Sequence, residues 1–330
     1  MNKLICTLFL LLPLAMTAQT TDSSSYYLAL ADKAIELTEA NIYNSDLLNN
    51  ESWESFKTHV RSMKFTDAES FRSEWNKMGR SLPFSHYYIM RNAPKVTAAN
   101  TTGTVRYDYF NLKDIDENTC LLTVKSFSTG REAVDPIIDS LRRKPVKNLI
   151  VDLRGNTGGT IASALPLAQY LVNEPLYGGI FLTQKYFKNH KTPPVVNEYT
   201  SYTPFNEASF DLIIKGIHNS EGLYLIITPD EPTFKGKLYI LTDKRTASTC
   251  EPFVYGFKHS KRATIIGENT MGAMLNAEIF PLNDHLSIFI PTADYYTADG
   301  KRLDKVGVMP DKEVKSEEAL NEALRIINQQ

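Results

Sequence analysis

The sequence predicts an α/β protein, and three observations carry this prediction. Residues 237–267 read as a buried strand, a tight turn, a helix and a second strand. From residue 104 onward, short apolar runs alternate with segments of helical periodicity, a pattern typical of a sheet covered by helices. Before residue 95 the periodicity is mostly helical, so we expect a small helical domain ahead of the α/β core.

The first 18 residues predict an export signal. Lys3 gives the chain a positive start, and residues 4–16 form an apolar run that is too short to span a bilayer. We therefore expect residues 1–18 to be a signal peptide and the protein to be exported, to the periplasm or out of the cell. No later segment is long and apolar enough for a membrane helix, so we expect no transmembrane segment after signal removal.

The region that follows, residues 19–103, is expected to be helical. Apolar residues in 26–40 recur at the spacing of one helix face, and residues 52–63 and 66–78 predict two further helices. Small and polar residues between 92 and 103 predict the boundary to the core.

The core, residues 104–330, is expected to alternate strands with helices and to close on a helix. Strands are expected at 105–112, 120–124, 149–153, 180–187, 223–227, 237–241, 263–266, 277–282 and 286–290, with helices at 134–143, 161–172 and 317–327. Residues 188–205 predict a long loop, whose Tyr199 and Tyr202 either line a groove or lie on a solvated surface. The role of residues 173–236 is left open.

Composition argues against several functional classes. The chain has 330 residues, of which 42% are hydrophobic, so it can bury a sizeable core. Its net charge of −2, with both signs well mixed, gives no surface suited to a polyanion, so nucleic acid is not an expected partner. Beyond the signal only Cys120 and Cys250 remain, and whether they pair is left open. Because neither CxxC nor HExxH occurs, we expect no metal and no cofactor.

Ser248 stands at the predicted junction between a strand and a helix. Glu251 follows three residues later, which predicts a capping box, and Pro252 is compatible with the first helical turn. Free N–H groups at a helix start can also stabilise an oxyanion beside a nucleophile. From this segment alone, Ser248 is either a helix cap or a catalytic nucleophile.

Three motifs then resemble one enzyme family. Residues 148–159 read NLIVDLRGNTGG, residues 246–251 read TASTCE, and residues 307–311 read GVMPD. These segments, in this order, resemble the S41 peptidases, the tail-specific and tricorn-like proteases. The resemblance implies a spiral of β-β-α units like that of Clp protease and crotonase, and it selects Ser248 as the nucleophile. It also implies that the N–H groups of Gly159 and Thr249 form the oxyanion hole.

The sequence departs from the tail-specific branch of that family at the catalytic base. That branch carries a lysine where this chain has Ala273. The tricorn-like branch instead uses a Ser-His pair ahead of the core, which Ser85 and His86 match, and a glutamate near the end, where this chain has Asp304. The resemblance therefore implies His86 as general base, with Ser85 and Asp304 orienting it. No PDZ-like insertion is evident between His86 and the core.

Two functions remain open at this point. The first is an exported serine endopeptidase that cleaves peptides or unfolded proteins through an acyl-enzyme. The alternative is a non-catalytic protein that binds a peptide or small ligand on the same fold, which the shorter side chain of Asp304 would favour. The paired N–H donors would also suit an acyl-CoA enzyme of the crotonase type, but the export signal argues against it. Substrate preference and oligomeric state are not determined by the sequence.

Overall fold

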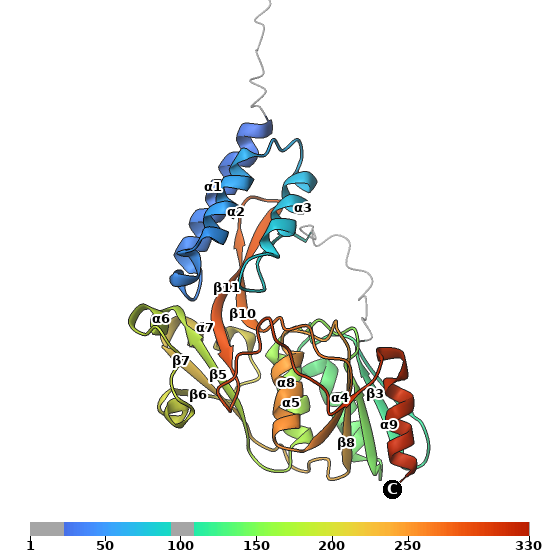
Figure 1. The fold of residues 1–330 in the computed structure, drawn as a ribbon. Coiled ribbons are helices and arrows are strands. Elements are labelled where there is room, and N and C mark those ends of the chain that lie inside the picture. Colours follow the sequence, from blue (N-terminus) through green and yellow to red (C-terminus); the bar gives the residue numbers. More distant parts are fainter. Residues whose placement is uncertain (1–22, 94–108, 330) are drawn as a thin grey trace, which may run out of the picture.

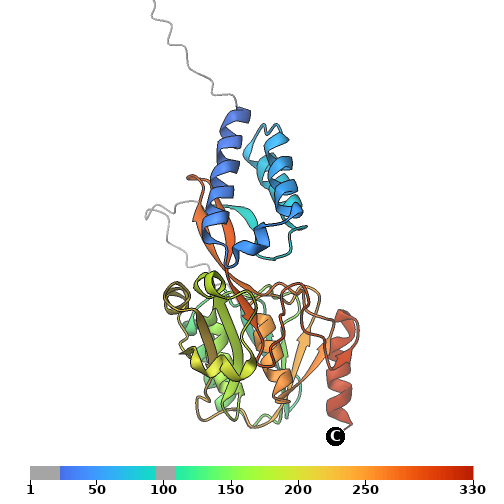
Figure 2. The same ribbon diagram turned by 60° about the vertical axis from the view of Figure 1, so that its left-hand side comes forward.

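A computed structural model describes residues 23–93 and 109–329. The predicted signal peptide at 1–18 and the predicted boundary at residue 103 lie outside these residues, so both remain predictions. Figures 1 and 2 show the N-terminal helices at one end of a larger body of sheets and helices. The expectation of an α/β fold behind a helical N-terminal region is confirmed. Within the described residues, no helix combines the length and apolar character needed to cross a membrane.

The first sheet has six strands in the order β12-β9-β8-β4-β3-β2. Every neighbouring pair is parallel except β2 with β3. Because Asp152 of β4 lies opposite Leu241 of β8, the chain leaves both strands at the same edge of the sheet. The strands are β2 (Phe110–Asp114), β3 (Thr119–Val124), β4 (Asn148–Asp152), β8 (Lys237–Thr242), β9 (Ala263–Gly267) and β12 (Lys312–Glu313).

The second sheet follows the order β1-β11-β5-β7-β6, and β10 also pairs with β11. Its longest strand, β11, pairs with β1 near its start and with β5 near its end. This strand therefore links the N-terminal region to the body of the molecule (Figure 1). The strands are β1 (Tyr88–Arg91), β5 (Leu176–Thr183), β6 (Thr203–Phe205), β7 (Gly222–Ile227), β10 (Leu275–Pro281) and β11 (Leu286–Tyr296).

Nine α-helices are described. Helices α1 (Ser23–Asn41), α2 (Glu51–Ser62) and α3 (Ala68–Gly79) form the N-terminal region. They bury Trp53 and Trp75 in a core that also includes Leu282 and Ile288 of the β10–β11 hairpin. The others are α4 (Arg131–Arg142), α5 (Ile161–Leu171), α6 (Gln184–Asn189), α7 (Phe210–Asn219), α8 (Cys250–His259) and α9 (Ala319–Asn328).

The segment 173–236 is where the structure departs most from the sequence expectation. Residues 184–187, expected to end a strand, and residues 188–189, expected to begin a loop, form α6 instead. Helix α7 lies in a stretch for which no helix was predicted. Tyr199 is 1% exposed and packs in the hydrophobic core, so it does not lie on a solvated surface. It lines a second cavity together with Tyr177 and Tyr224. Tyr202 packs at the edge of the same core. Packing against the second sheet, rather than local propensity, gives this segment its structure.

Candidate active site

Ser248 lies in the turn between β8 and α8, and the predicted capping box is wrong. Helix α8 begins at Cys250, its N-cap is Thr249, and no side chain caps it. A capping serine has extended backbone, whereas Ser248 has φ 54°, in the left-handed region. Its N–H donates to the carbonyl of Ala273 at 2.9 Å. A residue other than glycine in this conformation is strained, and such local strain is often found at functional sites.

Glu251, expected to complete the capping box, instead fixes the neighbouring loop. Its buried carboxylate accepts hydrogen bonds from Thr270 Oγ1 at 2.6 Å and from the N–H groups of Gly272 and Ala273 at 2.8 Å each. Burial raises the pKa of Glu251 to about 7, against the lowering effect of these donors. Since Ala273 in turn accepts from the Ser248 N–H, Glu251 supports the position of Ser248.

His86 approaches Ser248 from the N-terminal region, 162 residues away in the chain. Its Nε2 lies 3.1 Å from Ser248 Oγ, and its Nδ1 lies 2.7 Å from Ser85 Oγ. The pair precedes β1, and the pairing of β1 with β11 brings it to the body of the molecule. His86 also has a left-handed backbone, with φ 56°. Burial lowers the pKa of His86 to about 4, although the nearby Asp304 carboxylate acts in the opposite direction.

Asp304 contacts the backbone beside His86. Its side chain is completely buried. Oδ2 accepts from the Ser85 N–H at 3.1 Å and from Arg302 Nη2 at 3.3 Å, while Oδ1 accepts from the Met274 N–H at 3.2 Å. Among the described residues no hydrogen bond joins Asp304 to the His86 ring. The carboxylate therefore holds the loop that carries His86 and acts on the ring through its charge.

Arg302 is a part of this arrangement that sequence reasoning missed. It donates through Nε to Asp294 at 2.8 Å and through Nη2 to Tyr43 at 2.9 Å, as well as to Asp304. The two carboxylates and the phenol converge on one guanidinium, and they come from separate segments. No motif in the sequence marks these residues as partners.

The two predicted oxyanion donors lie beside Ser248. Gly159 has φ 145°, and hydrogen bonds of its two neighbours to Phe127 hold it in place. The Phe127 N–H donates to the Gly158 carbonyl, and the Thr160 N–H donates to the Phe127 carbonyl, both at 2.9 Å. Thr249 Oγ1 donates to the Gly159 carbonyl at 2.6 Å, which ties the two segments together. In the part of the chain that the structure describes, neither the Gly159 N–H nor the Thr249 N–H donates a hydrogen bond. Both groups are therefore free to bind an incoming oxygen.

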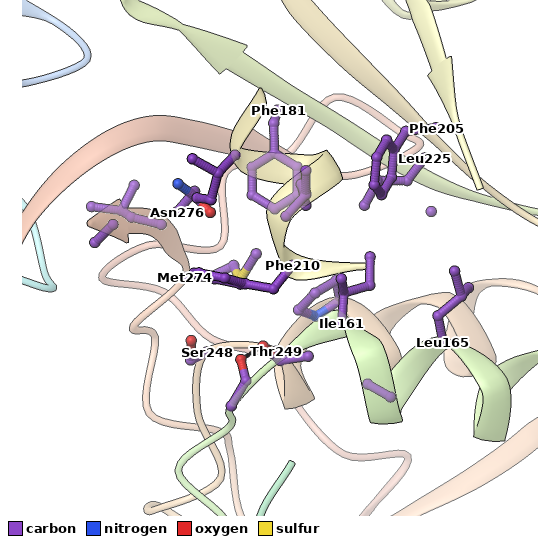
Figure 3. Close-up of a pocket in the computed structure, with 18 of the residues that line it drawn as sticks. Ile161, Leu165, Phe181, Phe205, Phe210, Leu225, Ser248, Thr249, Met274 and Asn276 are labelled. Atoms are coloured by element: carbon purple, nitrogen blue, oxygen red, sulfur yellow. Dashed lines mark hydrogen bonds between the residues drawn. The ribbon is translucent and has the colours of Figure 1, made fainter. Parts of the chain in front are cut away.

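A cavity of about 620 Å³ opens beside Ser248, His86, Gly159 and Thr249. Its lining is mostly apolar. Figure 3 shows Ser248 and Thr249 on one side, with Phe181, Phe205 and Leu225 opposite them. The opposite wall comes from β5, β6, β7 and α7, so the segment 173–236 builds the cavity above the nucleophile.

The cysteines lie outside this chemistry. Cys120 and Cys250 are both free and buried, which answers the open question of their pairing in this structure. Burial raises the pKa of the Cys250 thiol far above its usual range, so it is not a nucleophile. Within residues 23–93 and 109–329, no cluster of three His, Cys, Asp or Glu residues could hold a metal ion.

Comparison with known proteins gives the family. The sequence profile of Peptidase family S41 matches residues 118–314, more than half of the chain, so the chain belongs to peptidase family S41. It is similar to a chloroplastic carboxyl-terminal-processing peptidase 2 of Arabidopsis thaliana, with 27% identity over 54% of this chain and 28% of the relative. It is also similar to the carboxy-terminal processing protease CtpA of Bacillus subtilis, with 25% identity over 63% of this chain and 37% of the relative. The chain thus spans about a third of the length of these relatives.

Solved structures share the fold. A lipoprotein from Streptococcus agalactiae matches with a TM-score of 0.61 at 19% identity, over 98% of this chain and 99% of that one. The tricorn protease matches with a TM-score of 0.56 at 14% identity, over 92% of this chain and 35% of that one. At these identities the likeness establishes the α/β fold of the family and nothing finer.

Proposed function

We propose that the protein is an exported serine endopeptidase that hydrolyses peptide bonds through an acyl-enzyme. The observation that carries this proposal is the hydrogen-bonded chain Ser85–His86–Ser248, which ends beside two free N–H groups in an apolar cavity. A serine hydroxyl needs such a base to become a nucleophile, and an acyl transfer needs such donors to stabilise its oxyanion. Export follows from the expected signal at residues 1–18.

The geometry suggests a role for each group. Ser248 Oγ forms a bond to the substrate carbonyl carbon, while its proton passes to His86 Nε2. The negative oxygen of the tetrahedral intermediate accepts from the N–H groups of Gly159 and Thr249. His86 then gives its proton to the leaving amine, and the peptide C–N bond breaks. A water molecule attacks the resulting ester, with His86 as base again, and regenerates Ser248.

His86 can act in this way only if it is neutral and correctly oriented. Its lowered pKa keeps the ring neutral at pH 7. When Nε2 accepts from Ser248, Nδ1 carries the proton and donates to Ser85 Oγ, so Ser85 selects the required tautomer. Asp304 fixes Ser85 through its backbone, and its charge favours the imidazolium that forms during the reaction.

A fluorophosphonate probe, which acylates activated serines, tests this proposal. The wild type should be labelled, Ser248→Ala should not, and His86→Ala should label at least about a thousandfold more slowly. Ser260→Ala, at the opposite end of α8, is the matched control and should label like the wild type. Of the wild type, Ser248→Ala and His86→Ala, only the wild type should cut an unfolded protein substrate at internal peptide bonds. Labelling that survives Ser248→Ala would refute the assignment, and a wild type inert to both probe and substrate would favour the binding-protein alternative.

A further inference from the structure

Strand β10 runs along the cavity away from the proposed nucleophile. Ala273, just before the strand, accepts the Ser248 N–H at 2.9 Å, and every residue from 274 to 279 lines the cavity. β10 pairs with β11 along one edge, and no other strand within residues 23–93 and 109–329 pairs with it. An extended chain entering the cavity can therefore lie beside β10, with one end at Ser248.

Glu278 is the acidic group on this strand, and one of its oxygens has no partner among the residues that the structure describes. Oε2 lies 2.9 Å from His218 Nε2, whereas Oε1 is buried without a hydrogen bond. The side chain is 17% exposed and faces a mostly apolar cavity. A carboxylate oxygen that is removed from water and has no donor costs free energy, so the Glu278 carboxylate is stabilised when it turns toward a donor that a ligand brings into the cavity.

Together with Glu278, the charged residues that line the cavity give it one net negative charge. Asp211 on α7 adds a second carboxylate, while Lys215 is the single lysine or arginine that the described residues place in the lining. His86 also lines it and is neutral at pH 7 because of its lowered pKa. A positively charged donor on the substrate thus meets a carboxylate with one unpaired oxygen and a lining of net negative charge.

The position of Glu278 along the strand sets the spacing. Glu278 lies four positions after Met274, which is next to the Ser248 site, and an extended strand advances about 3.3 Å per residue, or about 13 Å in all. A substrate in extended conformation would cover the same length with about four residues. The apolar lining between these points suits apolar side chains.

We propose that Glu278 is a specificity-determining residue, which receives a lysine or arginine side chain about four residues from the scissile bond. This inference rests on the proposed peptidase function. The charged group donates to the Glu278 carboxylate, while the residues between it and the scissile bond pack in the apolar cavity.

The test is a set of peptides with one cleavable bond between apolar residues, in which a single lysine is moved from five positions before to five after that bond. The reference peptide has norleucine in place of lysine. In the wild type, kcat/KM relative to the reference should rise about 10- to 100-fold when lysine stands about four positions away on one side, and not when it is adjacent. In Glu278→Gln, which keeps the shape but not the charge, this ratio should fall to about one. Glu36→Gln, an exposed glutamate on α1, should keep the wild-type ratio.

Failure of this inference can be told apart from failure of the proposed function. If the reference peptide is cleaved but lysine gives no gain at any position, or the gain survives Glu278→Gln, Glu278 does not read the charge. If no peptide is cleaved, the peptidase proposal fails, and binding of the same labelled peptides to Ser248→Ala, with and without Glu278→Gln, still decides the inference. The inference is supported if Ser248→Ala binds the peptide with lysine about four positions away more tightly than the norleucine peptide, and loses this preference with Glu278→Gln. Equal binding of the lysine and norleucine peptides overturns the inference.

Discussion

Asp304→Asn separates a charge effect from a structural one. Asp304 holds three donors with two oxygens, namely the Ser85 N–H, the Met274 N–H and Arg302. An asparagine of the same shape keeps one oxygen, so its amide N–H₂ must face at least one of these donors. It also removes the negative charge that raises the pKa of His86.

The loss of stability expected in Asp304→Asn follows from the burial of this side chain. The Asp304 side chain is fully buried, and its pairing with Arg302 is broken by the change. Breaking one partner of a buried ion pair typically costs about 3–5 kcal/mol, and Arg302 keeps Asp294, so we expect a loss of about 3 kcal/mol in unfolding free energy. A displacement of the Ser85–His86 loop by about 1 Å would lower kcat/KM by about a hundredfold.

The diagnostic result is the pH profile of kcat/KM on a peptide substrate. The base must be neutral, and without the Asp304 charge its pKa falls further, so the acid limb should move to lower pH in Asp304→Asn. A purely structural role would lower the rate and leave the limb in place. The two contributions are therefore separable in one experiment.

Asp294→Asn is the matched control, since Asp294 is buried and binds the same Arg302 but does not contact Ser85. It should reduce stability without moving the acid limb. If Asp304→Asn leaves the limb unchanged, or if Asp294→Asn shifts it equally, the reasoning about the Asp304 charge is wrong. A rate equal to wild type in Asp304→Asn would remove Asp304 from the site altogether.

Three further predictions concern the same site. In the wild type, kcat/KM should fall only as pH drops through about 4, because burial lowers the pKa of His86 to about 4; an acid limb at pH 6–7 in a pH–rate profile would contradict this. The folded-state pKa of Glu251, about 7, lies above its ordinary value of 4.5. Between these pH values the folded protein therefore binds a proton that the unfolded chain does not, and the stability that this proton contributes is lost as pH rises from 4.5 through 7. In urea unfolding, the free energy of unfolding should therefore fall from pH 5 to pH 7 by about 2 kcal/mol more in the wild type than in Glu251→Gln. An equal fall in both proteins would refute the assignment. Gly159→Ala places a Cβ 2.2 Å from the Phe127 carbonyl carbon at φ 145°, so thermal unfolding should show severe destabilisation and probe labelling should be lost. Gly155→Ala, where nothing lies within 4 Å, should cost only the strain of its backbone, about 1 kcal/mol, and should still label.

The sequence by itself determined the alternation of strands and helices and the motifs on one sheet edge. Short apolar runs mark β4 and β8 because buried parallel strands have few polar positions. Their parallel pairing then brings the Gly159 loop and the Ser248 turn together. The resemblance to the S41 peptidases singled out Ser85 and His86, which no local pattern would have distinguished. Their catalytic roles remain predictions.

The tertiary structure decided what depends on contacts between distant segments. A Ser-x-x-Glu pattern predicts a capping box from local spacing, but the contact of Ser248 with Ala273, and of Glu251 with the same loop, overrides it. Segment 173–236 has weak local signals, and its structure comes from packing on the second sheet, which also creates the cavity. The lowered pKa of His86 comes from burial by residues far away in the chain, so the sequence alone could not supply it. The same holds for the unpaired oxygen of Glu278, because only the folded arrangement shows that no described residue reaches it.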